Sequence, residues 1–187
     1  MQRRELVSAW DADVVKLGSW IDEARGRYVE RLLSEARAIA ANLLGMELGL
    51  SYRSGWARDV TFEEALAASW SHDQETGTTQ VGPQRAEIGI RLNGAAVKDR
   101  ISRGQQKLLA SGLLLAQLQL LPRRDASRPT LLLDDPAAEL DADRLLGLIR
   151  EVSTQSLQLI VTSLRADFSA FGSPGRRYVM DSGDIAA

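Results

Sequence analysis

The stretch Leu131-Leu132-Leu133-Asp134-Asp135-Pro136 joins an apolar run to two carboxylates. Its leucines predict a short buried strand, and continuous apolar strands are typical of parallel sheets. The two acids follow at the C-terminal end of that strand, which is the edge where ligands of α/β sheets bind. The first acid could hold a magnesium ion through water, and the second could orient or deprotonate an attacking water. The alternative is an acidic strand end that turns into a helix at Pro136, and this stretch alone does not separate the two.

The surrounding sequence alternates between helical and strand patterns. Predicted helices cover 102–121 and 141–152, and predicted strands cover 130–134, 157–162 and 176–180. Short apolar strands that alternate with helices indicate an α/β sheet, parallel in this region.

A second stretch that could bind a ligand is Ile101-Ser102-Arg103-Gly104-Gln105-Gln106-Lys107. A Ser-x-Gly at a helix start can present a hydroxyl, backbone N–H groups and the positive helix end to an anion. A capped helix start without any ligand is the alternative. Two neighbouring stretches favour the ligand-binding interpretation: Glu139-Leu140-Asp141 follows the acidic pair, and Leu159-Ile160-Val161-Thr162-Ser163 adds a further strand with polar residues at its tip.

Residues 5–44 predict one long helix. Its apolar residues follow heptad-like spacing with one small phase shift: Val14, Leu17, Ile21, Ala24, Tyr28, then Leu32, Ala36, Ile39 and Leu43. Such a one-sided helix is expected to lie along another helix, and Trp10 and Trp20 are expected to pack.

Further signals lie between residues 45 and 98. Gly45 is expected to end the long helix, and a strand is predicted over 46–53. Thr61 with Glu64 forms a capping-box pattern that opens a helix to about residue 74. Asn93-Gly94 predicts a hairpin between strands 87–92 and 95–98, because both turn positions need positive φ. The polar residues after 75 predict a boundary near 76, which divides the chain into 1–75 and 76–187.

Composition excludes several classes of site. The 187 residues contain no Cys and one His, so disulfide scaffolds, thiolate zinc sites, Cys nucleophiles and multi-histidine metal cages are excluded. That histidine, His72, falls at an exposed helix end and is expected to be a surface residue. A net charge of −2 argues against a generally basic nucleic-acid binder, although a local basic patch remains compatible with it. Neither a signal peptide nor a membrane-length apolar run is evident, so we expect a soluble, cytoplasmic protein.

These stretches resemble a known superfamily. Residues 102–107 resemble the signature motif of ABC-type ATPases, residues 131–136 resemble their Walker B strand, and Glu139-Leu140-Asp141 resembles the D-loop. Within that superfamily, the sequence 78–85, the Asn93-Gly94 hairpin and Arg103-Gly104-Gln105-Gln106 are similar to the RecF family over nearly the whole chain. The resemblance implies an α/β fold: the signature and Walker B part of an ABC-type ATPase head in 76–187, with a long-helix arm or lid subdomain in 1–75.

The three matched motifs imply a role for each of their residues in this sequence. Asp134 would coordinate Mg²⁺, and Asp135 would be the catalytic carboxylate that positions water. The signature residues would contact ATP bound to the opposite subunit, and the D-loop would connect the two sites; these residues are Ser102, Arg103, Gly104, Gln105, Glu139, Leu140 and Asp141. Arg85 and Arg91 are candidates for DNA or phosphate contacts, with ordinary solvated arginines as the alternative.

The resemblance implies an ATP-dependent DNA-binding homodimer of DNA replication, recombinational gap repair and the SOS response. It would act on single-stranded DNA and single-/double-strand junctions with RecO and RecR to direct RecA. A Walker A loop is absent, because none of the three lysines follows a Gly. We therefore expect the C-terminal half of a RecF-like ATPase, which by itself neither binds nor hydrolyses ATP appreciably.

Two side chains depart from the related patterns. Ser163 stands where transporter ATPases carry a His, and Gln84 stands where a His is expected in the Gly-Pro-x-Arg segment.

The first alternative function is a non-enzymatic interaction module that binds through the long helix. The second is an SMC or Rad50-like head fragment, which would need a far longer coiled coil.

Overall fold

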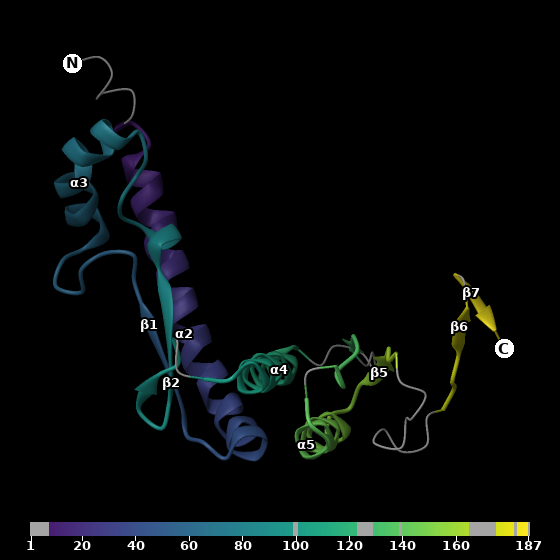
Figure 1. The fold of residues 1–187 in the computed structure, drawn as a ribbon. Coiled ribbons are helices and arrows are strands. Elements are labelled where there is room, and N and C mark those ends of the chain that lie inside the picture. The colour runs from purple at the N-terminus through teal and green to yellow at the C-terminus, as the bar shows by residue number, and fades with distance from the viewer. Residues whose placement is uncertain are drawn as a thin grey trace.

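The computed structural model describes residues 8–98, 101–122, 129–138, 140–164, 175–181 and 183–186. Its longest element is the helix α2 (Asp11–Leu44), with the N-terminal part of the fold arranged along it and the C-terminal part extending to one side (Figure 1). The helix ends at Gly45, whose φ of 64° is left-handed and whose N–H donates to the carbonyl of Ala41 at 2.9 Å. The long helix and its end at a glycine confirm the prediction, because Gly adopts this conformation without a Cβ penalty, although α2 begins at Asp11 and not at residue 5.

The two halves of α2 differ in burial. Toward its C-terminus Leu32, Ala36 and Ile39 are buried in the main core. Toward its N-terminus Trp10 and Trp20 are 68% and 64% exposed, so the expectation that both tryptophans pack was wrong. The reason is tertiary: Figure 1 shows α4 (Arg103–Leu120) crossing the C-terminal half of α2, whereas α3 (Phe62–Thr76) lies beside its N-terminal half.

An antiparallel sheet lies along α2. It contains β1 (Leu48–Arg53), β2 (Glu87–Leu92) and the short β3 (Ala95–Ala96) in that order. Asn93 and Gly94 have φ values of 48° and 77°, so the predicted two-residue hairpin is present. Since β1 pairs with β2, this sheet joins the sequence on either side of residue 76, and the expected boundary there stays a proposal.

The helix α3 (Phe62–Thr76) begins at the predicted capping box. The Glu64 N–H donates to the Thr61 hydroxyl at 3.2 Å, and the Thr61 N–H donates to the Glu64 carboxylate at 2.8 Å. The carboxylate of Glu64 also accepts the Thr61 hydroxyl at 3.0 Å, and the two bonds that it accepts, first that from the Thr61 backbone N–H, lower the pKa of Glu64. A short 3₁₀ turn, η1 (Pro83–Arg85), follows and leads into β2.

The main core forms where α4 (Arg103–Leu120) and α5 (Ala142–Ser153) meet α2 and the antiparallel sheet. Its largest fully buried side chains come from all of these elements: Ile39, Leu48, Leu108, Leu115, Leu148 and Val152. None of the helices in the described part of the chain is both long and apolar enough to span a membrane.

The remaining strands form two separate pairs. β4 (Thr130–Leu133) and β5 (Gln158–Val161) are parallel, as predicted, with Leu133 opposite Val161. β6 (Val179–Asp181) instead pairs antiparallel with β7 (Asp184–Ala186), so the expectation that the strand near 176–180 extends the parallel sheet was wrong. Gly183 in the connecting turn has a φ of 94°, which permits a tight hairpin at that point.

Candidate functional site

The carboxyl ends of β4 and β5 lie at the same edge because these two strands are parallel. Asp134 follows directly after Leu133, and Thr162 follows directly after Val161. The Thr162 N–H donates to the carbonyl of Leu133 at 2.9 Å and so continues the ladder one step beyond the strands. The pairing therefore brings Thr162 beside the acidic pair that the sequence singled out.

The hydroxyl of Thr162 contacts both acidic residues. It donates to Asp134 Oδ1 at 2.5 Å and accepts the backbone N–H of Asp135 at 3.1 Å. A hydroxyl has one donor and two acceptor positions, so a single side chain serves both bonds. Thr162 was not among the predicted site residues. The available signal was its position at the end of the neighbouring parallel strand.

Asp135 has an unusual backbone conformation. Its φ of 36° lies in the left-handed region, which non-glycine residues seldom adopt. Pro136 follows it, and a residue before proline normally prefers extended backbone. The Asp135 carbonyl accepts the N–H of Ala138 at 3.1 Å, which closes a turn. Backbone of this kind costs on the order of 1–3 kcal/mol and is typical of functional sites.

The signature residues lie at the N-terminus of α4. Ser102 and Gln105 form a reciprocal capping box: the Gln105 N–H donates to the Ser102 hydroxyl at 3.2 Å, and the Ser102 N–H donates to Gln105 Oε1 at 2.9 Å. Ser102 and Arg103 are exposed, whereas Gly104 is buried. The serine hydroxyl and the positive helix end therefore face solvent, as anion binding requires.

The signature and the acidic pair are separate in this chain. Within the described ranges, no hydrogen bond or ion pair joins Ser102, Arg103 or Gln105 to Asp134 or Asp135. Each group is ordered by its own local contacts.

Two of the D-loop residues, Leu140 and Asp141, lie at the start of α5. Asp141 is the N-cap: its Oδ1 accepts the N–H of Arg144 at 2.9 Å, and its other oxygen lies 3.2 Å from the Arg144 guanidinium. Leu140 is buried in the main core. Glu139 lies outside the described residues.

The two candidate arginines make local bonds. Arg85 donates to Gln80 Oε1 at 3.1 Å, and Arg91 donates to the carbonyl of Gly94 at 2.9 Å. Gln84, at the position where a His was expected, donates to the carbonyl of Val81 at 2.9 Å and so stabilises its own loop.

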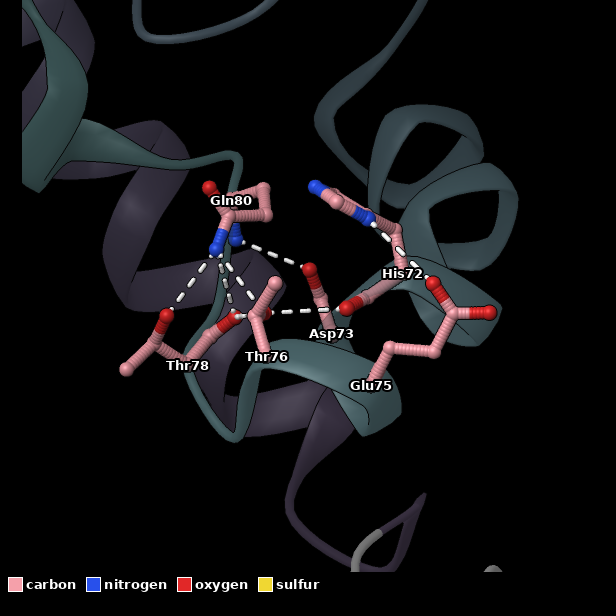
Figure 2. A network of polar contacts seen from close by, with 6 residues as sticks. All are labelled: His72, Asp73, Glu75, Thr76, Thr78 and Gln80. Atoms are coloured by element: carbon pink, nitrogen blue, oxygen red, sulfur yellow. Dashed lines mark hydrogen bonds and ion pairs between the residues drawn. The ribbon is translucent and has the colours of Figure 1, made fainter.

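Figure 2 shows how the polar segment after α3 is held. Asp73 accepts the backbone N–H of Gln80 at 2.9 Å, and the Gln80 amide donates to the hydroxyls of Thr76 and Thr78 at 3.0 and 2.9 Å. His72 lies beside this network, with Nδ1 3.7 Å from the Glu75 carboxylate and its side chain 63% exposed. The prediction of a surface histidine is confirmed.

No three His, Asp or Glu side chains in the described residues converge on a possible metal position. Asp134 nevertheless fits a magnesium ion, because it is an exposed carboxylate whose hydrogen bond to Thr162 engages one of its two oxygens. Mg²⁺ is usually held by one or two carboxylates, with waters and substrate phosphates as the other ligands.

No protein-family model matches the chain. It is 37% identical over 165 residues to the DNA replication and repair protein RecF of Vibrio atlanticus (strain LGP32). The alignment covers 88% of this chain and 46% of that relative. A solved structure of the recombination mediator protein RecF with ATPrS, in the RecFOR pathway, matches with a TM-score of 0.78 and 22% identity over 97% of this chain and 50% of that one. Another solved structure, of RecF with ATP in the RecFOR pathway, matches with a TM-score of 0.71 and 26% identity. The match covers 87% of this chain and 46% of that one. The chain spans about half the length of the curated relatives it matches.

Proposed function

In sequence and in fold this chain corresponds to about half of a RecF protein, and from that premise we propose that it works as part of an ATP-dependent DNA-binding protein of DNA replication and repair. The chain supplies the acidic pair and the signature motif of a composite ATP site. The rest of that site comes from a Walker A segment that these 187 residues do not contain.

One observation carries this proposal: the contact of the Thr162 hydroxyl with Asp134 and with the backbone of Asp135. It presents two carboxylates at the C-terminal edge of a parallel sheet, in a turn that is held in a strained backbone conformation. ATP as the nucleotide is supported by the structural relative, which was solved with ATP bound. In this arrangement the Asp135 carboxylate accepts a proton from, or orients, the water that attacks the terminal phosphate.

Asp134 would hold Mg²⁺ through its carboxylate. When bound, the ion supplies positive charge beside the phosphates. The task of this chain is then to keep the Asp134 carboxylate in one orientation, which the hydroxyl of Thr162 does at 2.5 Å.

The signature residues act on a different ATP molecule. Ser102, Gly104 and Gln105 lie at a helix start where Ser102 is exposed, and Ser102 and Gln105 make no bond to the acidic pair, which suits contact with nucleotide held by a second subunit. ATP would thus join two copies in a homodimer. Asp141, which caps α5 close after the acidic pair, would communicate between the two sites.

DNA is the proposed macromolecular ligand, at single-strand regions and single-/double-strand junctions. Arg85 and Arg91 are the proposed backbone contacts, since each guanidinium is exposed and held by one local hydrogen bond. RecO and RecR are the proposed protein partners, in recombinational gap repair and the SOS response in the cytoplasm.

ATP turnover tests this function. The purified chain is assayed alone and after reconstitution with the Walker A half of a RecF relative. We expect negligible turnover alone and measurable turnover in the complex. Asp135→Asn keeps the size and the backbone N–H but removes the carboxylate, so it should lower turnover about a hundredfold or more. Asp13→Asn, an exposed acid in the first turn of α2, is the matched control and should leave turnover unchanged.

Two results would contradict the proposal. Robust turnover by the isolated chain, lost in Asp135→Asn, would show that its site is already complete. A stable reconstituted complex without turnover, or with turnover insensitive to Asp135→Asn, would exclude Asp135 as the catalytic carboxylate.

A further inference from the structure

Thr162 is the one side chain in the described residues that bonds to both members of the acidic pair. We propose that it is a positioning residue for ATP hydrolysis, an inference that rests on the proposed function. Its hydroxyl orients the Asp134 carboxylate and holds the Asp135 backbone in the turn that presents the second carboxylate.

The two bonds depend on each other. The hydroxyl hydrogen points to Asp134 Oδ1, which leaves the oxygen lone pairs for the Asp135 N–H. Because the hydroxyl donates its hydrogen to Asp134, its oxygen becomes a stronger acceptor for the N–H of Asp135. One hydroxyl thus couples the orientation of one carboxylate to the backbone that carries the next.

The conformation of Asp135 explains why such a contact is needed. With a φ of 36° and a proline after it, Asp135 would relax toward extended backbone without a partner for its N–H. Relaxation would move its carboxylate away from the strand edge. The pairing of Leu133 with Val161 places Thr162 where it can prevent this relaxation.

A catalytic role for Thr162 itself is not implied. Its hydroxyl is already committed to two protein partners, so it acts through the two acids. Residues of this supporting kind typically change activity tenfold to a hundredfold, which is the range expected here.

The test compares three variants. Thr162→Val removes the hydroxyl at similar size, and Thr162→Ser keeps it. Thr130→Val makes the same change at the opposite end of the same two strands, where the Thr130 hydroxyl lies 3.2 Å from Gln158 Oε1. Thr130→Val therefore controls for loss of a threonine hydrogen bond in this sheet without touching the acidic pair.

The first readout uses the chain as it is. Hydrogen exchange of the Asp135 amide, measured by NMR, should become about fivefold faster in Thr162→Val. Thr162→Ser should restore most of the protection, and Thr130→Val should leave this amide unchanged. Unaltered exchange in Thr162→Val would overturn the positioning role.

The second readout is turnover in the reconstituted complex. Thr162→Val should lower kcat about tenfold or more while the KM for ATP changes less than about twofold, and Thr162→Ser should recover most of the loss. Faster exchange with an unchanged kcat would overturn the link to hydrolysis. Absence of turnover in the wild-type complex would overturn the proposed hydrolysis and this role within it, while the exchange data would still decide whether Thr162 holds Asp135.

Discussion

The side-chain amide of Asn42 donates a hydrogen bond to the carboxylate of Glu151 at 3.1 Å and so joins α2 to α5 across 109 residues of sequence. Glu151 is 9% exposed and is the one charged residue buried among the described ones. A carboxylate at this depth depends on its partner, because an unpaired buried polar group loses its interaction with water without replacement. This contact connects α2 to the helix that follows the acidic pair in the sequence.

Asn42→Ala should therefore lower the free energy of unfolding by about 1–3 kcal/mol, since it removes the donor and leaves Glu151 buried. Gln155→Ala removes an amide that makes an exposed bond to Thr154, and it should change stability by less than about 0.5 kcal/mol. Urea denaturation measures both values. Equal effects of the two changes would mean that the Asn42 contact adds nothing.

Gly18→Ala should destabilise the contact between α2 and α3. A Cβ at Gly18 would lie 2.4 Å from Phe62 Cε1, and the buried Phe62 ring is stacked on Trp56 with centroids 4.6 Å apart. We expect a loss of about 1–3 kcal/mol in the free energy of unfolding.

Gly147→Ala is the matched control for that change, because Gly147 is also inside a helix but has open space around its Cβ position. It should raise the free energy of unfolding by about 0.5–1 kcal/mol, since alanine favours the helix. Thermal denaturation of both variants gives the comparison. Destabilisation by Gly147→Ala, or none by Gly18→Ala, would contradict the close packing at Phe62.

Tyr52 should make stability depend on alkaline pH. Burial, then its hydrogen bond to Asp22 at 2.7 Å and the charge of that carboxylate, raise the pKa of Tyr52 from 10 to about 12. Because the folded pKa exceeds the unfolded value, the contribution of Tyr52 to stability is complete below about pH 10 and is lost as the pH rises to about 12.

The measurement is the difference in free energy of unfolding between wild type and Tyr52→Phe across this pH range. That difference should shrink as the pH rises, whereas the difference for Tyr178→Phe, an exposed tyrosine, should stay near zero. A constant difference for Tyr52→Phe would show that the hydroxyl is not held by Asp22.

The parallel pair of strands should drive self-association. Leu132 and Ile160 are opposite each other in the register and are 69% and 48% exposed, whereas the other face of these strands packs on the core. Parallel sheets are normally covered on both faces, so this face is an exposed apolar patch. We expect concentration-dependent sedimentation and binding of a dye that reports exposed apolar surface.

Replacing both Leu132 and Ile160 with Thr should reduce sedimentation mass and dye binding, while β-branched threonine keeps the strand propensity. Ile185→Thr, at a residue 63% exposed on the separate β6–β7 hairpin, is the control and should change neither. If the wild-type chain sediments as a monomer at all concentrations and binds no dye, the prediction is wrong.

The predictable parts of the fold depend on signals contained within a few residues. Gly45 ends α2, Thr61 with Glu64 opens α3, and Asn93-Gly94 turns β2 into β3, as their sequence patterns indicated. Each of these outcomes follows from backbone preference and hydrogen bonds between near neighbours, so no distant residue was needed to decide it.

The predictions that were wrong concern contacts between segments, which local sequence signals do not determine. The exposure of Trp10 and Trp20 depends on which elements cross α2 at each point along its length. The strand after residue 178 was correctly expected, but its partner was decided by the turn at Gly183. Periodicity and composition report what a segment prefers and do not report which neighbour covers it.

The sequence by itself determined the acidic pair, the capped start of α4 and the order of the strands and helices from α2 to β6, although not β7, because local chemistry and spacing are sufficient for these. Only the tertiary structure decided that the Thr162 hydroxyl lies against Asp134 and the Asp135 N–H. That contact joins residues 27 and 28 positions apart, and it exists because β4 and β5 pair in parallel with Leu133 opposite Val161. Strand register is a property of two segments packed together on one core, so neither segment alone carries it.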